Sequence, residues 1–307
     1  MPDYLTFKDM YEKIQRIAGD LSGADLDKQK DVANMVYLDE ILVCDDLFPC
    51  LWFLVYQDNL IRTKTAKTAT GITAANPPVV SSAAHGFANG DIIQFGNDVG
   101  GMVEVRNGTF LVADRAAGTF ELQTLDGTDI DGSAFTAFTS GGTIYHRGVT
   151  PSASIEKVLS LAIHGYSGEL DPIGEKQLEE TTAWWDPANI GRPERFMLKK
   201  YFTTAGAESN RLLWFPNPQE VYQMRLWYEK QISPLSADTD VPILPPRYHN
   251  AIVSGSVARL VQYGQVQIEN AVIWPSIYKA QIAALVSANR KWWRQYQKDE
   301  RSGLYLA

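Results

Sequence analysis

The stretch VRNGTFLVADRAAGTFELQ, residues 105–123, contains two short runs of aromatic, aliphatic and β-branched residues separated by small and polar ones. Runs of this kind predict short β-strands joined by tight turns. The same texture, rich in Thr, Ala, Gly, Asn, Asp and Val, extends from about Thr63 to Arg147. Five strands are predicted within it: Pro78–Ser81, Asp91–Phe95, Gly108–Val112, Thr119–Gln123 and Gly142–His146. Short strands of this sort, separated by pairs such as Asn89-Gly90, favour a small all-β barrel.

The segment before this stretch has a helical period instead. Apolar residues recur every three or four positions from Phe7 to Ile17, and Thr6 stands at the N-cap position. A second helix is predicted from about Lys28. The apolar run Cys50–Leu60 fits both a helix and a buried strand, so its structure stays open.

A helical spacing of apolar residues returns after Thr150. Ile155, Val158, Leu159 and Ala162 share one side of a predicted helix there. The period then becomes two on either side of Asn217-Pro218, which predicts an antiparallel hairpin over residues 211–232. Two more helices are predicted over residues 248–263 and from Pro275 to about residue 299.

These patterns together predict an α+β fold, a helical bundle body with an antiparallel β-hairpin and an inserted small all-β barrel domain. The predicted divisions are residues 1–65 for the N-terminal part of the body and 66–148 for the inserted barrel. Residues 149–299 form the rest of the body, and residues 300–307 form a C-terminal tail.

Composition narrows the functional classes. The 307 residues carry a formal charge of −8, which argues against wrapping nucleic acid over most of the surface, because such binding needs clustered Lys and Arg. No apolar stretch approaches the roughly 18 residues of a membrane span, and the first eleven residues lack the features of a secretory signal. Two cysteines, Cys44 and Cys50, are predicted to be buried free thiols.

Motifs for catalysis are missing. Neither a phosphate-binding G-x-x-x-x-G-K-[ST] nor a dinucleotide-binding G-x-G-x-x-G occurs in the sequence. The small residues Ser254-Gly255-Ser256 lie in a predicted helix, where they favour close helix packing over a hydrolase elbow. The four histidines have no metal-ligand spacing. We therefore predict no catalytic residue, no metal and no cofactor.

Residues 70–145 resemble the first catalytic-cysteine half-domain (FCCH) of ubiquitin-activating enzymes. The resemblance rests on Ala84-His85-Gly86-Phe87, Asn89-Gly90-Asp91, Gly101-Met102-Val103-Glu104-Val105 and Gly118-Thr119-Phe120-Glu121-Leu122. This stretch holds no cysteine, so the resemblance implies a β-barrel decoration and no ubiquitin chemistry.

The remainder resembles the head-to-tail adaptor, or head-completion, proteins of tailed bacteriophages. The resemblance rests on the N-terminal helix pair, on Leu213-Trp214-Phe215-Pro216-Asn217-Pro218, on Leu244-Pro245-Pro246-Arg247-Tyr248-His249 opening a helix, and on the long last helix. It implies a non-enzymatic virion protein of the neck, made in the host cytoplasm. It also implies a twelve-fold ring beneath the portal, with a C-terminal segment that reaches the portal.

The expected partners are the portal protein, a tail nozzle or tail tube protein, further copies of the chain, and genomic DNA that passes through the lumen without specific binding. No membrane partner is expected. Portal-docking residues are predicted near the C-terminus: Trp293, Tyr296, Arg301, Leu304 and Tyr305. Tail-side residues are predicted at the hairpin turn: Trp214, Phe215, Pro216, Asn217 and Pro218.

Two alternatives stay open at this point. The chain can be a tail-associated receptor- or glycan-binding protein whose β-domain is the recognition module. It can also be a hydrolase whose site is assembled from distant residues, since catalytic triads are spatial and not sequential.

Overall fold

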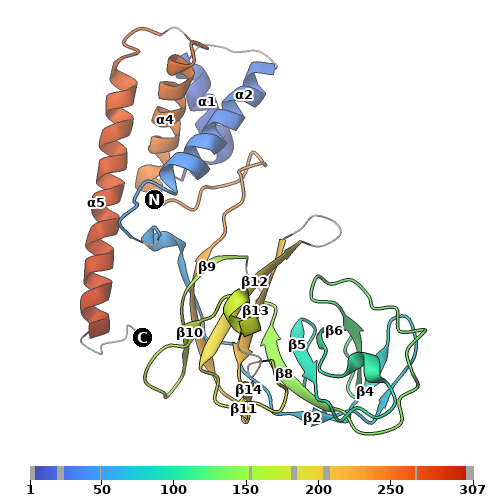
Figure 1. Cartoon of the computed structure of the whole chain (residues 1–307). Helices are drawn as coiled ribbons and strands as arrows, with labels where there is room; N and C mark the ends of the chain where they lie inside the picture. The colour runs from blue at the N-terminus through green and yellow to red at the C-terminus, as the bar shows by residue number, and fades with distance from the viewer. Residues whose placement is uncertain are drawn as a thin grey trace. The chain divides into compact units, whose positions relative to one another are not determined.

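The computed structural model describes residues 4–18, 24–48, 50–151, 154–180, 185–202, 208–266 and 268–301. The chain divides into two compact units, one of residues 1–56 with 231–307 and one of residues 57–230. We call the first the helical unit and the second the β unit, because helices dominate one and strands the other (Figure 1).

The helical unit contains α1 (Phe7–Ala18), α2 (Ala24–Met35), α4 (His249–Gln262) and α5 (Ile273–Arg301). A π-helix, Val36–Ile41, continues α2, and short 3-10 turns occupy Trp52–Leu54 and Pro246–Tyr248. The helices predicted near residues 7–17, 248–263 and 275–299 are confirmed. The Thr6 hydroxyl accepts the Asp9 backbone N–H at 3.2 Å while Asp9 Oδ2 accepts the Thr6 N–H at 2.9 Å, which is a reciprocal N-terminal cap.

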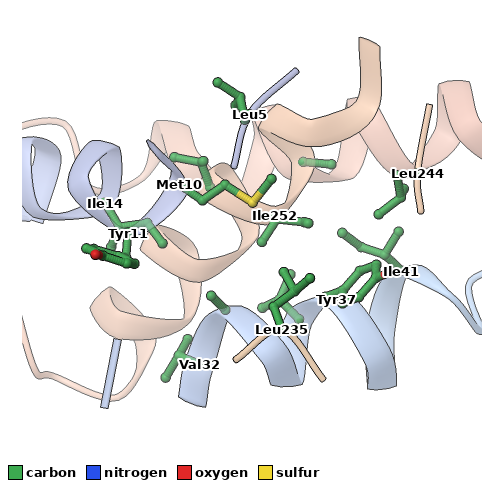
Figure 2. Close-up of a cluster of buried hydrophobic side chains, with 14 of the residues drawn as sticks. Leu5, Met10, Tyr11, Ile14, Val32, Tyr37, Ile41, Leu235, Leu244 and Ile252 are labelled. Carbon is green, nitrogen blue, oxygen red and sulfur yellow. The ribbon is translucent and has the colours of Figure 1, made fainter. Parts of the chain in front are cut away.

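The core of the helical unit is apolar. Figure 2 shows side chains of α1, α2, the π-helix and α4 pointing toward one another. Met10, Ile14, Ile41 and Ile252 are fully buried. Residues of the 231–248 segment, including Leu235 and Leu244, close the same cluster. Each buried aliphatic side chain contributes about 1.5–3 kcal/mol relative to exposure, so this cluster accounts for the association of helices far apart in sequence.

Small residues let the helices approach closely, as the sequence predicts. A Cβ at Gly255 of α4 would lie 2.6 Å from Val36 Cγ1 and 2.8 Å from Tyr278 Cε2. The hydroxyl of the neighbouring Ser256 donates to the Ile252 carbonyl at 2.7 Å. The Ser254-Gly255-Ser256 stretch is therefore a contact between α4, the π-helix and α5.

The β unit is built on a ten-stranded sheet in the order β10-β12-β13-β8-β5-β6-β7-β4-β3, with β2 paired to β8. Its strands are β2 (Lys67–Thr68), β3 (Gly71–Ile72), β4 (Val79–Ser81), β5 (Asp91–Phe95), β6 (Thr109–Ala113), β7 (Thr119–Gln123), β8 (Thr143–Val149), β10 (Asp171–Pro172), β12 (Arg195–Phe202) and β13 (Glu208–Phe215). Strands form at all five ranges predicted within residues 63–147.

The remaining strands form two smaller sheets. One has the order β1-β15-β9, from β1 (Val55–Asp58), β9 (Ile155–Ile163) and β15 (Met224–Lys230). The other pairs β11 (Ile190–Gly191) with β14 (Asn217–Pro218). A short helix α3 (Glu175–Glu180) and a 3-10 turn, Val103–Val105, complete the unit.

The predicted fold class, a helical bundle body with an inserted small barrel, is wrong. The described residues form fifteen strands and five α-helices, and the strands predicted to form the barrel belong to the ten-stranded sheet. The reason lies at β8, which pairs with β5 over residues 144–149 and also, through Gly148 and Val149, with Leu213 and Leu212 of β13. A Cβ at Gly148 would lie 2.3 Å from the Leu212 carbonyl oxygen, so the missing side chain is what allows β13 to join the sheet.

Two local predictions are also wrong. The helix predicted after Thr150 is strand β9, whose residues 155–163 pair antiparallel with β15. The hairpin predicted over residues 211–232 does not form, because β13 pairs with β12 while β15 pairs with β9. The observed hairpin is β12–β13, with Arg195 opposite Phe215. A period of two predicts strands correctly but does not identify the partner strand.

Candidate interaction surfaces

The C-terminal half of α5 is fastened to the loop of residues 43–52. Asn289 Oδ1 accepts the Trp52 backbone N–H at 3.0 Å, and Asn289 Nδ2 donates to Asp45 Oδ2 at 2.9 Å. Trp293 Nε1 donates to the Cys50 carbonyl at 2.8 Å, and the Phe48 ring stacks on Trp293 at 6.0 Å. Trp293, one of the predicted portal-docking residues, is thus a buried anchor of α5.

The other predicted portal-docking residues lie farther along the chain. Tyr296 stacks on Trp292 with 5.3 Å between the ring centroids and 11° between the planes, and it also meets the edge of Trp293. Arg301 is the last residue of α5. Leu304 and Tyr305 lie outside the described residues. The structure therefore brings Trp293 and Tyr296 together.

One side of α5 near this end is basic. Lys291 and Arg294 are exposed, and with five further residues they line a hollow of about 720 Å³: Ala283, Val286, Ser287, Arg290 and Gln295. No carboxylate lines this hollow among the described residues. We call it the basic surface of α5, and it is suited to an acidic partner.

The predicted tail-side residues Trp214–Pro218 are all buried in the β unit. Trp214 Nε1 donates to the His146 carbonyl at 3.1 Å. Asn217 bridges several elements, because its Nδ2 donates to Gln94 Oε1 at 3.3 Å and to the Pro187 carbonyl at 3.1 Å. These side chains pack in the interior of the β unit, whereas the next three residues, 219–221, are exposed.

Arg147 is the charged centre of this interior. Its side chain is fully buried, its Nη1 donates to Asn217 Oδ1 at 2.8 Å, and its guanidinium lies 4.4 Å from the centroid of the Phe215 ring. Burial lowers the pKa of Arg147 to about 9. Nothing in the sequence spacing connects Arg147 with Asn217, so the sequence does not predict this contact.

A second buried polar group joins Lys64, Asp91 and His146. The Lys64 ammonium is paired with Asp91, and His146 Nε2 lies 3.4 Å from Asp91 Oδ1. Burial raises the pKa of Asp91, but the hydrogen bonds of His146 and Lys64 and the charge of Lys64 outweigh it and hold that pKa below its ordinary value. Burial lowers the pKa of His146 more strongly than Asp91 raises it. His146 is therefore neutral near pH 7.

Ring nitrogens of three histidines contact other groups of the chain: both are hydrogen-bonded in His85 and His249, whereas in His146 only Nδ1 is, and Nε2 is buried 3.4 Å from Asp91 Oδ1. His146 Nδ1 accepts the Lys64 N–H at 3.0 Å. His85 accepts the Phe87 N–H at 3.0 Å and reaches the Ala116 carbonyl at 3.0 Å. His249 accepts the Leu5 N–H at 3.1 Å and reaches the Leu244 carbonyl at 2.8 Å. A general base needs a free ring nitrogen facing its substrate, so these three side chains have a structural role.

The remaining candidates for a reactive group or a metal ligand are the cysteines and the acidic residues. Cys50 is buried, Cys44 is half-buried, and burial raises the pKa of the Cys44 thiol to about 11, which disfavours the reactive thiolate. Within the described residues, no three His, Cys, Asp or Glu side chains are grouped to hold a metal ion. Among the same residues, no helix has the length and apolar character needed to cross a membrane.

Comparison with known proteins adds one match. The family model described as SU10 adaptor protein matches residues 128–301, more than half of the chain. The matched residues include strands β8 to β15 and helices α3, α4 and α5. No curated protein matches this chain.

Proposed function

Because the chain belongs to the SU10 adaptor protein family, a family of phage head-tail adaptors, we propose that it joins the capsid portal to the tail. Membership makes the chain a structural component of the virion that contacts other head or tail proteins. We also propose that copies of the chain form a ring through which the genome passes. The resemblance to head-to-tail adaptors implies that this ring is twelve-fold. The observation that carries it is the match over residues 128–301.

On the portal side, the proposed contact is the end of α5 with the residues that follow it. The anchor formed by Asn289 and Trp293 fixes α5 against the loop of residues 43–52. It thereby sets the direction in which the helix leaves the unit. Direct contact is assigned to Tyr296, Arg301, Leu304 and Tyr305 and to the basic surface of α5. Trp293 is a positioning residue, because it is buried.

On the tail side, Trp214–Pro218 would act as a packed base, because their side chains are buried in the chain. Direct contact with a tail nozzle or tail tube protein is assigned to the exposed residues that follow. Val221 is 59% exposed, and Gln219 and Glu220 are also exposed. Rigid support for an exposed segment reduces the entropy lost on binding.

Residues 70–145 are proposed to be an inserted module similar to FCCH that braces neighbouring capsid or fibre proteins. The family match begins at residue 128, so it covers neither most of this stretch nor the residues before it. The net acidity of the chain further suggests a DNA passage lined by carboxylates, which would repel the DNA backbone and keep it from sticking.

Electron microscopy of the purified chain mixed with its portal tests the adaptor proposal. We expect a ring of the chain at one end of the portal, and a chain truncated after Trp293 should lose at least about tenfold in portal affinity. Arg294→Glu should also weaken binding, because it reverses a charge of the basic surface. Lys279→Glu is the matched control, since Lys279 is an exposed cation near the other end of α5. Undiminished binding by the truncated chain would refute the portal contact.

A further inference from the structure

A groove lies at the N-terminal end of α5, away from the surfaces described above. Its volume is about 420 Å³, and residues of α1, α4 and α5 line it. Its apolar part includes Ile17, Trp274 and Ile277, the last 37% exposed. Lys13 and Arg16 stand at the same groove, and neither forms an ion pair with a described carboxylate. The groove is therefore apolar and carries two cationic side chains, which fits an apolar segment that also carries carboxylates.

The loop after the π-helix has the opposite character. Val43 is 65% exposed and Leu47 is 68% exposed, although both are large aliphatic residues. Asp46, which precedes Leu47, is exposed too, and it is not paired with a cation of the described residues. We call these three residues, Val43, Asp46 and Leu47, the acidic knob.

The acidic knob is held rigidly. Asp45, between Val43 and Asp46, is buried, accepts from Asn289 Nδ2 at 2.9 Å and pairs with Arg290 at 3.3 Å. Phe48, which follows Leu47, stacks on Trp293. A surface that is already ordered before it binds loses less conformational entropy on association.

The knob cannot fill the groove of its own chain. The groove meets α5 at Trp274, Ile277 and Gln281, whereas the knob is anchored to α5 at Asn289, Arg290 and Trp293. Thirteen residues of helix from Ile277 to Arg290 span about 20 Å. Both patches belong to the helical unit, so this separation is fixed by one rigid helix. A contact between them requires two chains.

We propose that the acidic knob of one chain docks in the basic apolar groove of a second copy. Asp46 would face Lys13 and Arg16, while Val43 and Leu47 would cover Ile17, Trp274 and Ile277. Two different patches that meet in this way form a head-to-tail contact, which closes into a ring when the rotation between neighbours permits. The inference rests on the proposed ring and names the surfaces that would join its subunits.

Charge reversal in the full chain tests the contact. Arg16→Glu and Asp46→Arg should each raise the concentration at which half of the chains associate by about tenfold or more, because like charges then face each other. Mixing the two variants should restore association, since in alternating chains every groove faces a knob of opposite charge. Sedimentation velocity over a concentration series measures both effects. Lys279→Glu and Asp31→Lys are the controls, because both reverse exposed charges outside the two patches.

A disulfide experiment checks the same contact by position. Chains carrying Leu47→Cys mixed with chains carrying Ile277→Cys should form a mixed disulfide dimer on oxidation, whereas Leu60→Cys with Ile277→Cys should not. The proposal is overturned if the charge variants behave like the controls, if mixing them fails to restore association, or if the unmodified chain stays monomeric at every concentration. These results need no portal, so they are separate from the adaptor proposal, which fails only if the unmodified chain does not bind its portal.

Discussion

The two units of the chain are stabilised in different ways. The core of the helical unit is mainly apolar, with Met10, Ile14 and Ile252 fully buried, and the polar side chain His249 is buried beside it. The β unit instead buries charged and polar side chains, among them Arg147 and Asn217, within its interior. Apolar packing tolerates shifts of position, whereas a buried guanidinium needs its acceptor at one place. The β unit should therefore be the more sensitive of the two to single substitutions.

The largest expected effect is at Trp214, which is fully buried in the β unit. Trp214→Ala should destabilise the β unit by about 3–5 kcal/mol, through the lost apolar contact and the cavity left behind. Urea unfolding measures the loss, and hydrogen exchange resolved by peptide shows whether it falls in residues 57–230. Trp214→Phe, which keeps most of the ring, should cost much less. A stable Trp214→Ala protein that fails only in tail binding would instead support a direct contact for this residue.

Asn217→Ala tests the buried guanidinium. It removes the acceptor 2.8 Å from Arg147 Nη1, and a hydrogen bond to a charged group is worth about 1.5–3 kcal/mol. The double variant Arg147→Met with Asn217→Leu removes both polar partners, and it should recover most of the stability. A double variant no better than Asn217→Ala would show that packing around Asn217, and not the lost hydrogen bond to Arg147, explains the loss.

Gly255→Ala tests the helical unit by overpacking. The added Cβ would lie 2.6 Å from Val36 Cγ1, and such strain costs about 1–3 kcal/mol, partly offset by about 1 kcal/mol of better helix propensity. We expect a net loss of about 1 kcal/mol in urea unfolding. Gly118→Ala is the control, since a Cβ there meets nothing within 4 Å. Equal stabilities for the two variants would mean that Val36 and Tyr278 move aside freely.

The smallest effect should come from pH, and it should appear in both units. Burial lowers the pKa of His146 in the β unit and of His249 in the helical unit below the ordinary value of 6.5. The unfolded chain therefore binds more protons than the folded chain just below that value, and stability falls as pH drops from 7.5 to 5.5. Asp91, whose folded pKa is lowered from 3.8, adds a further loss at more acidic pH.

Hydrogen exchange at pH 7.5 and 5.5 separates the two histidines. His146→Gln should reduce the pH sensitivity of the β unit alone, and His249→Gln that of the helical unit alone. A pH sensitivity of the β unit that persists unchanged in His146→Gln would assign it to other groups.

Local structure was largely predictable from the sequence, for identifiable reasons. The apolar spacing from Phe7 to Ile17 and the cap at Thr6 predict α1 because both act within a few residues. The strand at Asp91–Phe95 is predicted for the same reason, by its β-branched residues after Asn89-Gly90. Strand β9 was mistaken for a helix, because Ile155, Val158, Leu159 and Ala162 satisfy a helical spacing and only pairing with β15 makes the segment extended.

The candidate surfaces, too, were only partly predictable from the sequence. The sequence points to the aromatic residues of both predicted sites, but it does not show that two of them are buried. Trp293 anchors α5, and Trp214 packs inside the β unit. The acidic knob and its groove were missed, because exposure of Val43 and Leu47 depends on what the rest of the helical unit covers.

The sequence by itself determined where most helices, strands and turns occur, since propensity, capping and hydrophobic period act over a few neighbouring residues. Only the tertiary structure decided that β8 joins strands expected in separate domains, that Arg147 meets Asn217, and that an acidic loop and a basic groove are left uncovered on one unit. Those outcomes depend on contacts between residues tens to hundreds of positions apart, for which a single sequence carries no local signal.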